Sequence, residues 1–207
     1  MIRNIITGTE KLLSGSKAVY VMYGSIQDEH ELEKSGGEGV SLIMISLRLM
    51  QDTMDDYIAM RNWFLEPELQ KWVWCDEKGE PPVPLERVIE KYGPRIKNPT
   101  DVFPYFILRD NRPIGFIQYY IQDEETIGLD MWIGAVKERN SGHGTDALKQ
   151  MVNIIHQKHP HVKELFIDPE VDNLRAIKCY RKAGFQCVGE ITDEEGDTCL
   201  LHKIIFI

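Results

Sequence analysis

The stretch "ERNSGHGTDALKQMV", residues 138–152, decides which fold this chain adopts. A loop with two glycines, Gly142 and Gly144, runs directly into the apolar spacing of an amphipathic helix, expected over 145–159. The first N–H groups of a helix have no partner inside the helix, and glycines let a ligand approach the backbone closely. The stretch therefore predicts a binding site for a phosphate compound.

Two common nucleotide-binding motifs do not match this loop. A P-loop requires a lysine directly before the Ser or Thr, whereas Thr145 follows a glycine. The dinucleotide fingerprint requires a third glycine, and Ala147 occupies that position. Neither of these two classes of nucleotide site is therefore indicated.

The segments around the loop predict an α/β (α+β layered) domain. Strand-like and helix-like runs follow each other in the order β, α, α, β-hairpin, β, α, β, α, β, β. An antiparallel front half followed by β-α-β-α crossovers predicts a mixed central sheet flanked by helices. The expected helices cover 52–65, 85–96, 145–159 and 173–184, and Gly93-Pro94 is expected to stop the second one. The expected strands cover 40–50, a hairpin over 102–121, 126–136, 162–169 and two closing strands.

The first 40 residues differ in character from the remainder. We interpret residues 1–40 as an N-terminal extension of unknown role, with one possible strand over 18–24 and a polar, glycine-rich linker over 25–40. Residues 41–207 form the predicted domain.

Composition and charge exclude several classes of function. The chain has 207 residues, 43% of them hydrophobic, and a formal net charge of −9, which argues against nucleic acid as a partner. No apolar run approaches the roughly 18 residues that a membrane span needs. The four cysteines have no C-x-x-C spacing, which favours free thiols in a reducing cytoplasm.

No metal site is expected at His156, His159 and His161, because Pro160 separates them and no acidic or cysteine ligand accompanies them. The pattern leaves open whether the chain is a monomer or a homodimer.

A second motif lies downstream of the glycine loop. The first motif is Arg139-x-x-Gly142-x-Gly144, and the second has the pattern N-x-x-A-x-x-x-Y-x-x-x-G-F, from Asn173 to Phe185. Together they resemble the acetyl-CoA site of the GNAT acetyltransferase superfamily. The resemblance implies the GNAT fold, with acetyl-CoA as co-substrate and no metal.

The resemblance also implies which residues contact acetyl-CoA. Backbone N–H groups of residues 140–145, together with Arg139, would face the pyrophosphate, although a solvated Arg139 stays open as an alternative. The His143 side chain is expected to face solvent. The implied cofactor-binding residues are Ile133, Gly134, Val136, Arg139, Ser141, Gly142, His143, Gly144, Thr145, Asn173 and Ala176.

Longer stretches narrow the resemblance. "IDPEVDNLRAIKCYRKAGF" (167–185), "IGLD" (127–130), "YFILRDNRPIGFIQYYI" (105–121) and "ELQKWVWCDE" (68–77) are similar to the aminoglycoside 6′-N-acetyltransferases, whose closest branch contains siderophore-type lysine N-acyltransferases. The likeness covers residues 41–205. It implies transfer of acetyl to a primary amine of a small cationic acceptor, first of all an aminoglycoside 6′-amine. Two alternatives stay open: acylation of a lysine, polyamine or peptide amine, and a non-catalytic acyl-CoA sensor.

The resemblance assigns roles to two groups that can move protons. Asp130 would either accept a proton from the acceptor amine or hold the ammonium in place, and Tyr180 would protonate the leaving thiolate. The structural alternatives are a solvent-facing Asp130 and a Tyr180 that only packs on its helix. Attack is expected to be direct, in a ternary complex without a cysteine acyl carrier. The implied acceptor-binding residues are Trp72, Trp74, Tyr92, Gln118, Asp130 and Asp168, with burial of the tryptophans as the alternative.

Overall fold

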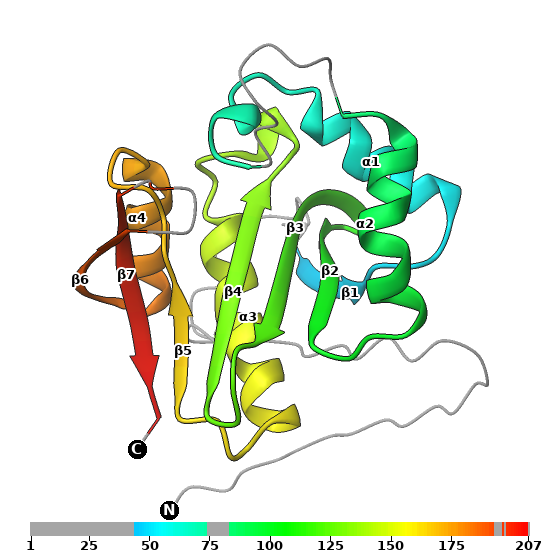
Figure 1. The fold of residues 1–207 in the computed structure, drawn as a ribbon. Helices are drawn as coiled ribbons and strands as arrows, with labels where there is room; N and C mark the ends of the chain where they lie inside the picture. Colours follow the sequence, from blue (N-terminus) through cyan, green and yellow to red (C-terminus); the bar gives the residue numbers. More distant parts are fainter. Residues whose placement is uncertain (1–43, 74–82, 193–195, 197, 207) are drawn as a thin grey trace, which may run out of the picture.

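The computed structural model describes residues 44–73, 83–192, 196 and 198–206, and the predicted order of helices and strands is confirmed (Figure 1). The predicted extension over 1–40 lies outside the described residues. The elements are β1 (Ile45–Leu49), α1 (Met54–Phe64), the 3₁₀ turn η1 (Leu69–Lys71), α2 (Leu85–Lys97), β2 (Val102–Arg109), β3 (Arg112–Ile121), β4 (Thr126–Ile133), the 3₁₀ turn η2 (Val136–Glu138), α3 (His143–Lys158), β5 (Glu164–Ile167), α4 (Leu174–Ala183), β6 (Gln186–Thr192) and β7 (Thr198–Ile205).

The sheet is mixed, as the sequence predicts. Its seven strands lie in the order β1-β2-β3-β4-β5-β7-β6. All neighbours are antiparallel except β4 and β5, which run parallel because α3 returns the chain between them. Among the helices that the structure describes, none is long and apolar enough to cross a bilayer.

Helices cover both faces of the sheet, and each face has its own core (Figure 1). On one face α1 and α2 pack on alternate residues of the central strands, among them Phe106, Phe116 and Trp132. On the other face α3 and α4 pack on the intervening residues, such as Ile107, Ile117 and Leu129. Because side chains alternate along a strand, Gln118 and Asp130 point to the α1/α2 face, as Phe116 and Trp132 do.

The parallel strands β4 and β5 separate after a short contact. Their pairing joins only Thr126–Gly128 to Glu164–Phe166. The second half of β4 therefore has no strand beside it on that side within the described part of the chain. This divergence opens the sheet at the point where β4 leads into the glycine loop.

Two predicted helix limits are wrong. Gly93-Pro94 does not stop α2, which continues to Lys97 with Pro94 inside it. Gly93 instead makes room for Tyr57 of α1, because a Cβ at Gly93 would lie only 3.3 Å from the Tyr57 hydroxyl oxygen. Helix α3 begins at His143 rather than at Thr145, because Gly142 adopts the left-handed conformation (φ 87°) that turns the loop into the helix.

Candidate active site

A cavity of about 880 Å³ occupies the opening between β4 and β5. Its walls come from both faces of the sheet: α2 and the segment after η1 on one side, and α3 and α4 on the other. It therefore joins the predicted phosphate loop to the predicted acceptor residues in one continuous space.

The N-terminus of α3 forms one wall of this cavity. Gly142 is the N-cap residue and offers no side chain to cap the helix, so the first N–H groups stay available to an anion. Gly144 has a packing role that the sequence did not indicate. A Cβ there would lie 3.2 Å from Met131 Cε and 3.3 Å from Cys179 Sγ.

The expectation that His143 faces solvent is wrong. The residue is only 6% exposed, and its Nε2 lies 3.1 Å from Oε2 of Glu138. Glu138 also accepts hydrogen bonds from Arg109, whose guanidinium holds the pKa of this carboxyl below its usual range against the effect of burial. The ring turns inward because helix α3 begins at His143 and so directs its side chain back toward η2.

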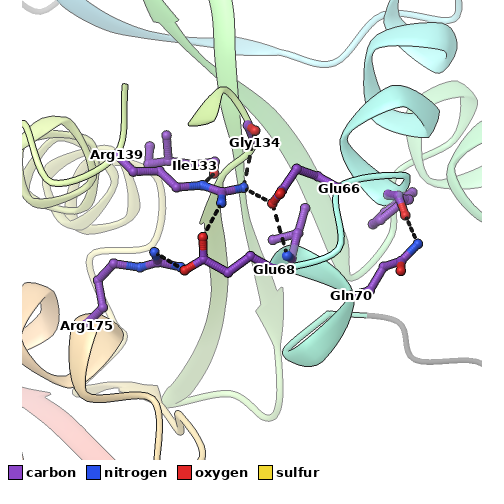
Figure 2. A network of polar contacts seen from close by, with 9 residues as sticks. Glu66, Glu68, Gln70, Ile133, Gly134, Arg139 and Arg175 are labelled. Carbon is purple, nitrogen blue, oxygen red and sulfur yellow. Dashed lines mark hydrogen bonds and ion pairs between the residues drawn. The ribbon is translucent and has the colours of Figure 1, made fainter. Parts of the chain in front are cut away.

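Arg139 lies in a network of ion pairs (Figure 2). Its side chain is 5% exposed, which contradicts the alternative of a solvated arginine. The guanidinium donates to Glu66 (2.6 Å), to Glu68 (2.8 Å) and to the Ile133 carbonyl (2.9 Å). Burial raises the pKa of Glu66, but the hydrogen bonds and the charge of Arg139 outweigh this effect, so the pKa lies below its usual value. The arginine therefore fastens the loop after β4 to the segment that leads into η1.

Helix α4 supplies the cationic wall. Its N-cap residue is Asn173, whose side-chain oxygen accepts from the Ala176 N–H at 3.2 Å. The residues Arg175, Lys178 and Lys182 line the cavity from this helix. Three cations beside an open helix N-terminus suit a ligand with several phosphates.

Asp130 lies at the opposite end of the cavity, on β4. Gln118 sits directly across the β3–β4 pair and donates from Nε2 to Asp130 Oδ2 at 2.6 Å. Burial raises the pKa of Asp130, against the Gln118 hydrogen bond and the charges of Lys91 and Arg95, which lower it. The half-buried Asp130 lines the cavity.

Tyr180 lines the same cavity from α4 and is only 5% exposed. Burial raises its pKa, so the phenol keeps its proton over the physiological pH range. The protonated phenol is available as a hydrogen-bond donor to a thiolate released beside it.

The sequence prediction did not identify Cys179 as a residue of this cavity. Its thiol lies 3.5 Å from the Thr145 hydroxyl, and burial raises its pKa. A thiol with a raised pKa is mostly protonated and therefore a poor nucleophile. Cys179 directly precedes Tyr180 in the chain, but this spacing did not indicate that its thiol would lie at the cavity.

Lys91 and Arg95 are also cavity residues that the sequence did not single out. They flank Tyr92 on α2, with the Arg95 guanidinium carbon 5.6 Å from the centre of its ring. Burial raises the pKa of Tyr92, which packs edge-on against Phe116 at 5.5 Å. The i and i+4 spacing of two cations around an aromatic residue was the signal that could have indicated them.

The structure brings most of the predicted site residues together. The cavity is lined by Ile133, Arg139, Gly142, His143, Gly144, Thr145, Asn173, Ala176 and Tyr180, and toward the acceptor end by Trp72, Tyr92, Gln118, Asp130 and Asp168. Of the described residues, Gly134, Val136 and Ser141 are not part of this lining. Trp74 lies outside the described residues. The family resemblance implies that the N–H groups of Ile133 to Val136 line the thioester, but the N–H of Ala135 is already donated to the Ile114 carbonyl.

The sequence of this chain matches a family of known proteins. The sequence profile of the Acetyltransferase (GNAT) domain family matches residues 52–193. The aminoglycoside N(6′)-acetyltransferase type 1 of Klebsiella pneumoniae is 31% identical over 164 residues, which cover 73% of this chain and 79% of that protein. The protein of the same name from Serratia marcescens matches equally well.

A solved structure gives the same picture. The aminoglycoside acetyltransferase AAC(6′)-Ib in complex with coenzyme A and kanamycin superposes with a TM-score of 0.68 at 26% identity, covering 78% of this chain and 95% of that one. The fold and the family predicted from the two sequence motifs are therefore confirmed. By the profile match over residues 52–193 and the relatives at 31% identity, this chain belongs to the GNAT acetyltransferase family.

Proposed function

We propose that this enzyme transfers acetyl from acetyl-CoA to a primary amine of a small cationic acceptor, the 6′-amine of an aminoglycoside being the first candidate. One observation carries the proposal: the Asp130 carboxylate shares a cavity with the open N-terminus of α3. The named activity of the relatives from Klebsiella pneumoniae and Serratia marcescens, at 31% identity, supports the choice of acceptor.

The residues divide the reaction between the two ends of the cavity. The N–H groups of α3 and the cations of α4 hold the phosphates, which leaves the gap between β4 and β5 for the pantetheine arm. Asp130, with its raised pKa, accepts the proton that the acceptor ammonium must lose before its nitrogen can attack. The new C–N bond forms as the C–S bond breaks, and Tyr180 protonates the departing sulfur.

Gln118 gives the acceptor end its polar specificity. Its Nε2 is used by Asp130, while its Oε1 is buried and has no donor among the described residues. A buried acceptor atom without a partner costs free energy unless a ligand or water satisfies it. The amide oxygen is therefore placed to accept a hydrogen bond from an acceptor amine or hydroxyl.

A second acceptor class is favoured by a different observation. Lys91 and Arg95 bring two positive charges to the end of the cavity where Asp130 lies. Such charges disfavour a polycation but suit an amine that also carries a carboxylate, as a lysine-type acceptor does. The acceptor assay must therefore contain both classes.

A panel of amines tests the proposal. Kanamycin, ribostamycin, lysine and spermidine are each incubated with the protein and acetyl-CoA, thiol release is followed, and products are identified by mass spectrometry. Acetylated aminoglycoside with faster turnover than lysine supports the first candidate. Turnover of lysine alone overturns it in favour of the second. Binding of acetyl-CoA without any acetylated amine would indicate a non-catalytic sensor.

We place this activity in the cytoplasm. Cys179 and Cys187 are free thiols, as a reducing compartment favours. Detection of the native protein in a cytoplasmic fraction, with acetylation activity in the same fraction, is the expected result.

A further inference from the structure

The Glu68 carboxylate connects two arginines that belong to different walls of the cavity (Figure 2). One oxygen lies 2.8 Å from Arg139, on the loop after β4, and the other lies 2.6 Å from Arg175, on α4. The ion pairs thus reach from the segment that leads into η1 across to the helix that carries the cationic wall.

The two arginines differ in how firmly they are held. The Arg139 side chain is 5% exposed and has a second carboxylate, Glu66, and two carbonyls as partners. The Arg175 side chain is 40% exposed, and Glu68, itself 47% exposed, is its partner. A buried arginine with several partners stays in place, whereas an exposed ion pair is weak and can exchange.

Arg175 also lies close to the expected position of phosphate. One helical turn after it on α4, Cys179 contacts the first turn of α3 at Gly144 and Thr145. Lys178 and Lys182 follow on the same side of the helix and line the cavity together with Arg175. Of these three cations, Arg175 has a carboxylate beside it that an incoming anion would have to displace.

We propose that Arg175 exchanges its ion pair with Glu68 for one with a phosphate group of the acetyl-CoA co-substrate. Glu68 therefore competes with the phosphate for Arg175 and lowers the affinity of the protein for this cofactor. The inference rests on the cofactor part of the proposed function. In the free protein Glu68 neutralises the Arg175 guanidinium, so an incoming phosphate must displace this carboxylate. When a phosphate replaces Glu68 at Arg175, the Glu68 carboxylate keeps its contact with Arg139 and remains beside η1.

The exchange links the two ends of the cavity. Glu68 directly precedes η1, and Leu69, Trp72 and Val73 continue from it as cavity residues. Release of Glu68 from α4 frees this segment on one side while Arg139 retains it on the other.

Calorimetric titration with coenzyme A tests the exchange. In Glu68→Gln the dissociation constant should fall by about 1.4- to fivefold, the range spanned by exposed ion pairs. In Arg175→Gln it should rise, and adding Glu68→Gln to that variant should bring no further gain. Pantetheine, which has no phosphate, should bind all variants equally well.

Glu66→Gln is the matched control, because Glu66 pairs with Arg139 but not with Arg175. It should not tighten coenzyme A. Weaker or unchanged binding in Glu68→Gln, or tighter binding that persists in the double variant, overturns the inference. Failure of coenzyme A to bind the unmodified protein would overturn the proposed function together with it. No acceptor is present in the titration, so a wrong acceptor assignment does not affect the outcome.

Discussion

Replacement of Arg139 by methionine tests whether this residue stabilises the fold or contacts the cofactor. Methionine retains most of the side-chain length but leaves Glu66 and Glu68 without their shared cation. Breaking a fully buried ion pair costs about 3 to 5 kcal/mol. Because the two glutamates are 23% and 47% exposed, water offsets part of that loss. We expect the free energy of unfolding to fall by about 2 to 3 kcal/mol, which lowers Tm by roughly 5 to 10 °C.

Thermal melts and urea titrations measure this effect, and Arg175→Met serves as the matched control. Its ion pair with Glu68 is exposed, so we expect a loss under about 1 kcal/mol. The pH dependence gives a second check, since the pKa of Glu66 is lowered from 4.5 in the folded state. Stabilisation by the pair is complete above pH 4.5 and is lost as the pH falls through the lower folded-state value. The difference between wild type and Arg139→Met should therefore narrow in acid.

One result would refute the reasoning. If Arg139→Met keeps the wild-type Tm within about 1 °C, a shift well below that expected for a buried pair, the network does not hold the fold together. If its affinity for coenzyme A falls at least tenfold at the same time, the guanidinium binds phosphate, as the sequence motif implies.

Three further substitutions test other parts of the site. Asp130→Asn should reduce kcat about 100-fold or more in a thiol-release assay, as expected for loss of a proton acceptor, and leave coenzyme A affinity unchanged in calorimetry; equal loss of both would make Asp130 structural. Gln118→Leu removes a hydrogen bond that lowers the pKa of Asp130, so the acidic limb of kcat/KM should move to higher pH; a limb that stays in place would separate it from Asp130. Gly134→Ala brings a Cβ within 2.2 Å of Trp63 and should cost about 1 to 3 kcal/mol in chemical unfolding. That cost should shrink in a Trp63→Leu background, and an undiminished cost would exclude the clash.

The local pattern of the sequence was sufficient for the fold and for the position of the phosphate loop. Among the described residues, hydrophobic spacing predicted the order of the α-helices and strands, because periods of 3.6 and 2 residues are properties of the chain itself. The start of α3 was wrong by two residues at the loop, and the end of α2 was wrong where a tertiary contact overrode the local signal. Gly93 packs against Tyr57 on another helix, and no pattern within α2 records that neighbour.

The same division separates the predicted site residues from those that were missed. Glu66 stands in a segment without a motif. The i and i+4 spacing of Lys91 and Arg95 does not show which elements face them, so their place at the site follows only from the fold.

Arg139 shows most clearly what each level decides. By itself the sequence determined that a glycine loop, an arginine and a helix follow the fourth strand, and the family follows from that order. Only the folded structure decided that the arginine turns away from the loop toward Glu66 and Glu68, 73 and 71 residues earlier in the chain. Backbone geometry is specified by neighbours in sequence, whereas the partner of a charge is specified by which distant segments the core brings within a few ångströms of it.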